Sequence, residues 1–238
     1  MMTMLINRDP VLEKFQKHLE SFGIRSKVLE EKLDFEYDYV DSHLLGDKDG
    51  IGGAGVLKLL DSPIDHVHLI KKQEFAKCDF AVGGSVGMGV HIHTWWKIRF
   101  FLSFPESITL GPFDIGTITT IKKGKFHSKV DSFLWSGYPK LTTLPPGLVR
   151  DNVADALYSN QLLRQLMIKC LLKERKITVS RYTNHKLNVT PTNSKIIIES
   201  TWKLQKNLFL DNDTIIMYEK IAEIVKLIVN ALKYHLRS

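Results

Sequence analysis

The chain has 238 residues, of which 44% are hydrophobic and 25% are charged. These proportions are those of folded globular proteins and differ from those of disordered or membrane proteins. Lysine and arginine outnumber aspartate and glutamate by 33 to 26, and the net charge of +7 favours anionic partners. No stretch of about 18 uncharged apolar residues occurs and the N-terminus lacks the apolar region of a signal peptide, so neither membrane insertion nor export is expected.

The two cysteines, Cys78 and Cys170, lie far apart in the sequence. They have neither the number of a disulfide framework nor the close spacing of a zinc ribbon or redox pair, so a reducing, cytoplasmic location is expected. Cys78 precedes Asp79, but no local motif would expose it as a nucleophile. The sequence therefore predicts no catalytic residue.

The first predicted element is a short amphipathic helix. Asp9 and Pro10 are typical of an N-cap and a first helical position, and apolar residues then recur at helical spacing as far as Gly23. Residues 33–39 alternate between aromatic and acidic side chains, which predicts a strand.

Residues 47–55 are rich in turn formers. Gly50, Gly52 and Gly55 match the spacing of a dinucleotide-binding loop, but that loop requires a buried strand directly before it, and charged residues stand there instead. The interpretation is a loop that leads into a short helix at 56–60.

Residues 88–104 form the best-defined predicted strand, because apolar and polar residues alternate through it. One face is apolar and carries Val90, Ile92, Thr94, Trp96, Ile98 and Phe100. The other, which we call the basic-aromatic face, carries His91, His93, Trp95, Lys97 and Arg99. The strand is therefore expected to be half-buried, with its basic side chains toward solvent.

Further strands are predicted on both sides of this one, at 64–70, 107–110, 117–121 and 125–135, with a hairpin turn at 122–124. Together they form a β-meander in the middle of the chain.

The C-terminal part is mainly helical. An apolar stripe at 149–171, with a break near Asn160, predicts one long helix or two short ones. Strands are expected at 177–182 and 195–203, and a final helix at 215–236 follows several N-cap residues.

These elements predict an α+β fold, in which a mainly antiparallel sheet with a central β-meander is packed by two long C-terminal helices and a short N-terminal helix. Residues 1–238 are expected to form a single domain. Two tightly packed subdomains with a boundary near 141–147 are the alternative, because Leu-Pro-Pro-Gly there would end the sheet.

The first candidate site is the basic-aromatic face. Cations that follow phosphates and rings on which bases stack are what single-stranded nucleic acid binding requires, and His91, His93, Trp95, Lys97 and Arg99 supply both. A covering helix would instead make Trp95 part of the core. The acidic block at 30–50 could also face the basic meander within the fold and neutralise it.

The second candidate is a metal site. His66, His68, His91 and His93 form two His-X-His pairs on predicted strands, and adjacent strands would present four imidazoles to one divalent transition metal. Scattered surface histidines are the alternative. The nearby Lys97 and Arg99 would oppose a bound cation.

The sequence thus favours a non-enzymatic binding or interaction module for an anionic ligand or single-stranded nucleic acid, with a metal-dependent enzyme as the alternative. Homo-oligomer formation through the last helix is a further hypothesis.

Overall fold

The computed structural model describes residues 10–30, 51–82, 85–105, 114–123, 128–136, 148–171, 176–181, 195–202 and 210–235. Along the described part of the chain, one helix is followed by six strands, two helices, two strands and a last helix. The strands are β1 (Ser26–Glu30), β2 (Ile51–Leu59), β3 (His66–Val82), β4 (Ser85–Ser103), β5 (Asp114–Lys123), β6 (Ser128–Trp135), β7 (Ile177–Arg181) and β8 (Lys195–Trp202). The helices are α1 (Pro10–Ser21), α2 (Leu148–Ser159), α3 (Gln161–Cys170) and α4 (Asn212–His235).

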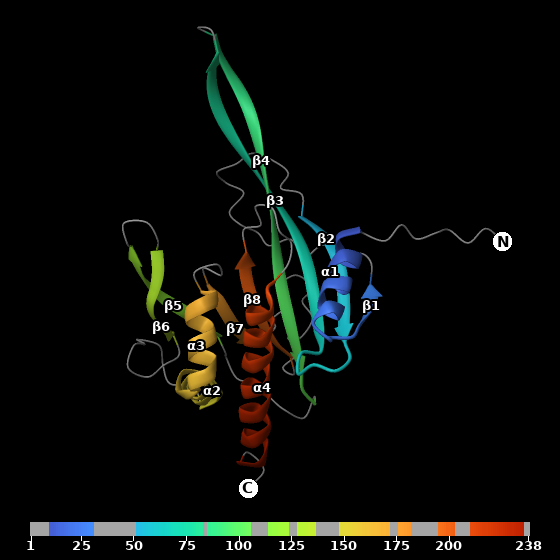
Figure 1. Cartoon of the computed structure of the whole chain (residues 1–238), viewed down its shortest axis with the longest axis vertical. Helices are drawn as coiled ribbons and strands as arrows, with labels where there is room; N and C mark the ends of the chain where they lie inside the picture. Colours follow the sequence, from blue (N-terminus) through green and yellow to red (C-terminus); the bar gives the residue numbers. More distant parts are fainter. Residues whose placement is uncertain are drawn as a thin grey trace, which may run out of the picture.

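The eight described strands form one antiparallel sheet in the order β1-β2-β3-β4-β8-β7-β5-β6. The α+β class predicted from the sequence is confirmed. The first four strands follow one another as a meander, and β7 and β8 are inserted between β4 and β5 (Figure 1). Strands that follow the predicted boundary at 141–147 therefore lie in the middle of the sheet, although the boundary itself is outside the described residues.

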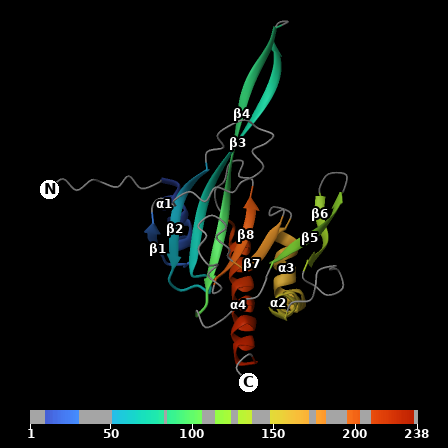
Figure 2. The ribbon, with the colours of Figure 1, turned by 180° about the vertical axis from the view of Figure 1, so that it is seen from behind.

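The helices lie over one face of the sheet, which we call the inner face (Figures 1 and 2). Ile98, Phe100 and Leu102 of β4 are buried on it, as the alternation in the sequence predicts. The ring of Phe100 lies 4.4 Å from that of Tyr218 on α4. Each such fully buried apolar side chain contributes roughly 2 kcal/mol, so this layer holds α4 against the sheet.

The predicted end of the first helix and the predicted break in the 149–171 stripe are confirmed. Helix α1 ends before Gly23, which has a φ of +81° that residues with a side chain rarely adopt. The apolar stripe at 149–171 is divided at Asn160, whose side chain accepts a hydrogen bond from the Leu163 N–H at 2.9 Å. Asn160 is therefore the N-cap of α3.

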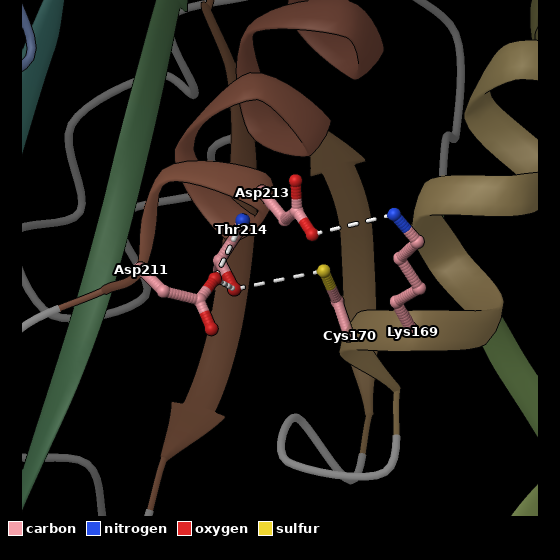
Figure 3. A network of polar contacts seen from close by, with 5 residues as sticks. All are labelled: Lys169, Cys170, Asp211, Asp213 and Thr214. Atoms are coloured by element: carbon pink, nitrogen blue, oxygen red, sulfur yellow. Dashed lines mark hydrogen bonds and ion pairs between the residues drawn. The ribbon is translucent and has the colours of Figure 1, made fainter.

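Helix α4 begins with a polar network that joins it to α3 (Figure 3). The Asp211 carboxylate accepts hydrogen bonds from the N–H and the hydroxyl of Thr214, at 2.9 and 2.7 Å. The same hydroxyl lies 3.6 Å from the Cys170 sulfur. Asp213 forms a longer, more exposed ion pair with Lys169, at 3.5 Å.

Two predictions in the first half of the chain are wrong, because residues 51–59 form strand β2 where the sequence predicts a loop at 47–55 and a short helix at 56–60. Strand β1 is not among the predicted elements. Leu57 and Leu59 are buried while Lys58 between them is exposed, so the period at this position is two rather than helical. The predicted strands at 33–39 and 107–110 lie outside the described residues.

Strands β3 and β4 extend beyond the sheet as a two-stranded ribbon (Figures 1 and 2). Their ladder runs from His66 opposite Phe101 to Val82 opposite Ser85, whereas the pairing of β2 with β3 reaches only Lys72 within the described residues. We call residues 73–82 and 85–94 the arm. The strand predicted at 64–70 is thus much longer than its apolar pattern indicates. In the arm, no helix among the described residues covers either face, so no alternation of apolar and polar residues is required there.

Candidate functional site

The outer face of the sheet, opposite the helices, carries a polar row across its middle strands. His68, Arg99, Glu199 and Thr178 lie directly opposite one another on β3, β4, β8 and β7, so they share this face. Arg99 Nε donates to Glu199 Oε2 at 2.7 Å. The pairing of β4 with β8 thus brings together Arg99 and Glu199, which are 100 residues apart in the sequence.

Arg99 is only 8% exposed, contrary to the expectation that the basic-aromatic face is solvated along its length. Phe101 and Ile197, which lie beside it on the same face, are also buried. An arginine removed from water requires a compensating anion, and Glu199 provides it. Arg99 is therefore a structural partner of Glu199 rather than an exposed contact for phosphate.

His68 lies next to this ion pair. Its ring is 4.0 Å from the ring of Phe101. Burial, followed by the positive charges of Arg99, His66 and Lys195, lowers the pKa of His68 to about 3. His68 is consequently a neutral, packed side chain at any pH near neutrality.

His66 stands at the border of the buried region and is partly exposed. Burial is the largest cause that lowers its pKa, and Lys195, Lys58 and Lys226 lower it further, whereas Asp65 raises it. Asp65 already binds Lys226 at 2.9 Å and accepts from the Ser103 N–H at 2.7 Å. Asp65 therefore offsets part of the effect that the three lysines have on the pKa of His66.

Three basic residues on neighbouring strands, Lys27, Lys58 and His66, form a set that we call the basic row. They lie directly opposite one another on β1, β2 and β3. Both lysines are exposed, and so is Lys195 on β8. Within the described part of the chain, neither Lys27, Lys58 nor Lys195 forms an ion pair, and like charges that face each other across strands destabilise a sheet.

The remaining residues of the basic-aromatic face lie further along β4. Lys97, Trp95, His93 and His91 are opposite Ile70, Lys72, Glu74 and Ala76, respectively. Their side chains are outside what the structure describes, so their role as a ligand surface stays a prediction.

The register separates the two His-X-His pairs. His68 is opposite Arg99, which is six residues along β4 from His93, and this spacing corresponds to about 20 Å in a strand. One metal ion cannot contact both pairs over that distance. Among the described residues, no group of three or more His, Cys, Asp or Glu side chains is placed to hold a metal ion.

Sequence reasoning missed Lys27, Lys58 and Lys195 as site residues. The sequence predicts a helix at Lys58 and no element at Lys27, so it does not predict that either residue lies beside His66. The Leu57-Lys58-Leu59 alternation is compatible with a half-buried strand, but a run this short does not exclude a helix.

No helix in the described part of the chain combines the length and apolar character needed to cross a membrane. No protein-family model, curated protein or solved structure matches the chain.

Proposed function

We propose that the protein is a binding module for a phosphate-bearing anionic ligand, held by the basic row (Lys27, Lys58 and His66) together with Lys195. The observation that carries this proposal is the alignment of Lys27, Lys58 and His66 on neighbouring strands, in which the two exposed lysines face each other. A bound anion would offset the repulsion between Lys27 and Lys58 and would favour the protonated form of His66.

The buried pair of Arg99 and Glu199 supports this position for the ligand. Because the middle of the outer face is already buried and neutralised, the exposed cations at its border are the groups that can still gain from an anion. Neighbouring strands are about 4.8 Å apart, so the long lysine side chains can reach a single phosphate or successive phosphates of a chain. Single-stranded nucleic acid and small phosphate compounds share this chemistry.

Binding of a fluorescein-labelled oligonucleotide of thymidines, measured by anisotropy, tests the proposal. With about three phosphate contacts, the affinity should fall roughly tenfold or more between 50 and 200 mM salt. Competition with inorganic pyrophosphate distinguishes the ligand classes: displacement at low concentration indicates a small phosphate compound, and weak displacement indicates a nucleic acid chain.

The double variant Lys58→Glu/Lys195→Glu should lose this binding. The matched control is Lys14→Glu/Lys17→Glu, which makes the same total charge change at exposed positions of α1 on the helix side. A flat titration of the wild-type protein at low salt, or equal binding by the two variants, would overturn the proposal.

A further inference from the structure

Along β3, one edge of the arm is unpaired among the described residues, and we call it the free edge. Positions 73–82 of β3 pair only with β4 in this part of the chain, since the described pairing of β2 with β3 extends no further than Ile51 opposite Lys72. Ten residues of strand extend about 34 Å. A two-stranded ribbon of this length is marginally stable alone, and its unpaired N–H and C=O groups can accept another strand.

The sequence of β3 in the arm is self-complementary about Cys78. In the stretch Phe-Ala-Lys-Cys-Asp-Phe-Ala, which covers 75–81, each residue has a fitting counterpart at the same distance on the other side of the cysteine. Lys77 mirrors Asp79, so a positive charge corresponds to a negative one. Phe75 mirrors Ala81 and Ala76 mirrors Phe80, so a large apolar residue corresponds to a small one in both cases.

We propose that two copies of the chain dimerise by antiparallel pairing of their β3 arm edges about a two-fold axis at Cys78. A two-fold interface requires that residue i contacts residue j of the partner while j contacts i. This ladder places Lys77 opposite Asp79 of the second copy, and Asp79 opposite its Lys77. Opposite charges and large-small pairs that face each other across strands are the stabilising arrangement.

The length of the free edge fits this arrangement. The same register places Val82, the last residue of β3, opposite Glu74 of the second copy. The partner strand therefore ends before Lys72, where pairing with β2 begins. The two β3 strands and the two β4 strands form a four-stranded ribbon, which satisfies the number of strands that a stable sheet requires. The edge of β4 lacks this complementarity, because Gly87 and Gly89 offer no side chains there.

Charge exchange tests the proposal by sedimentation velocity of the full chain. Wild-type protein should be dimeric at about 100 µM. Lys77→Asp alone and Asp79→Lys alone each place like charges opposite at two positions, so each should raise the dimer dissociation constant roughly tenfold or more. The double variant Lys77→Asp/Asp79→Lys restores opposite charges and should dimerise as the wild type does.

A mixture of the two single variants gives the most specific test of the proposed register. Lys77→Asp protein paired with Asp79→Lys protein has opposite charges at both positions, so heterodimers should form at concentrations at which each variant alone is mainly monomeric. A monomeric wild-type protein, or single variants that dimerise like the wild type, would overturn the proposal. Circular dichroism spectra that match the wild type exclude misfolding as the reason for a monomeric variant.

Cys78 provides an independent measure of the register. Residues directly opposite in an antiparallel pair have Cα atoms about 4.5 to 5.5 Å apart, within the range that a disulfide spans. Diamide should accept two electrons and two protons from the two Cys78 thiols and yield a covalent dimer. Cys78→Ser protein should give no covalent dimer. If the Asp79→Lys variant gave as much covalent dimer as the wild type, the result would contradict the register. The outcome does not depend on the anionic ligand, because the basic row lies outside the arm.

Discussion

Arg99 and Glu199 are the residues on which the outer face depends most. Their charged groups are 2.7 Å apart, with side chains that are 9% and 21% exposed. Removing one partner of a pair this poorly hydrated takes a neutralising charge away from the other, whereas replacing both removes the two charges together.

Arg99→Met is therefore expected to lower the free energy of unfolding by about 3 kcal/mol. Urea denaturation at neutral pH measures the change. The double variant Arg99→Met/Glu199→Met should recover part of the loss, because no buried charge is then unpaired. Equal stabilities of the single variant and the wild type would show that water, not Glu199, balances Arg99.

His68 makes stability depend on pH. Its pKa is about 3 in the folded protein because of burial and the nearby Arg99, against an ordinary value of 6.5. The unfolded chain therefore binds the proton first, and stability is lost as the pH falls from about 6.5 toward 3. Between pH 7 and pH 5 the loss from this residue alone is about 2 kcal/mol.

His68→Phe should reduce the pH dependence of the unfolding free energy by that amount. The phenylalanine keeps the contact with the ring of Phe101 but cannot bind a proton. Denaturation curves at pH 7 and pH 5 for both proteins give the comparison. The same loss of stability in both proteins would mean that His68 is protonated in the folded state.

At the scale of the element, the start of α4 depends on a single carboxylate. Asp211 accepts two hydrogen bonds from Thr214, whose hydroxyl is otherwise near only the Cys170 sulfur among the described residues (Figure 3). Loss of an N-cap costs about 1 kcal/mol, and a buried hydroxyl without a good acceptor adds to that cost.

Asp211→Ala is accordingly expected to destabilise the protein by about 1 to 2 kcal/mol in thermal or urea unfolding. The matched control is Asp213→Ala, which removes the exposed pair with Lys169 and should cost less than about 1 kcal/mol. An equal effect of the two substitutions would show that the N-terminal charge of α4, and not the cap, stabilises the helix.

The helices were predictable because each has a local signal. Asn160 divides an apolar stripe, and Asp211 precedes another. Strand β2 was mistaken for a helix because Val56-Leu57-Lys58-Leu59-Leu60 is too short to separate a period of two from one of 3.6. Only its neighbours β1 and β3 decide the conformation of such a segment.

At the scale of the whole molecule, the order of the strands could not be derived from the sequence. The insertion of β7 and β8 beside β4 pairs Arg99 with Glu199, and this long-range pairing turns an expected solvated arginine into a buried one. The alternation of β4 was correctly predicted, since Ile98 and Phe100 are buried on the inner face. The alternation specifies which residues share a face but not what covers that face.

The same long-range order relocates the candidate site. The pairing of β1, β2 and β3 brings Lys27 and Lys58 next to His66, whereas His91 and His93 lie in the arm, far from His66 and His68. The anionic ligand therefore belongs, in our proposal, at the border of the sheet, and the arm is left for contact between copies of the chain.

The ionisation of His66 tests the central claim most directly. NMR titration of its imidazole signal should give a pKa below 6.5 in the free protein, because burial and the charges of Lys195 and Lys58 oppose protonation. Saturating inorganic pyrophosphate should raise that pKa, and by linkage pyrophosphate should bind more tightly as the pH falls. A pKa of His66 that is the same with and without pyrophosphate would contradict the account.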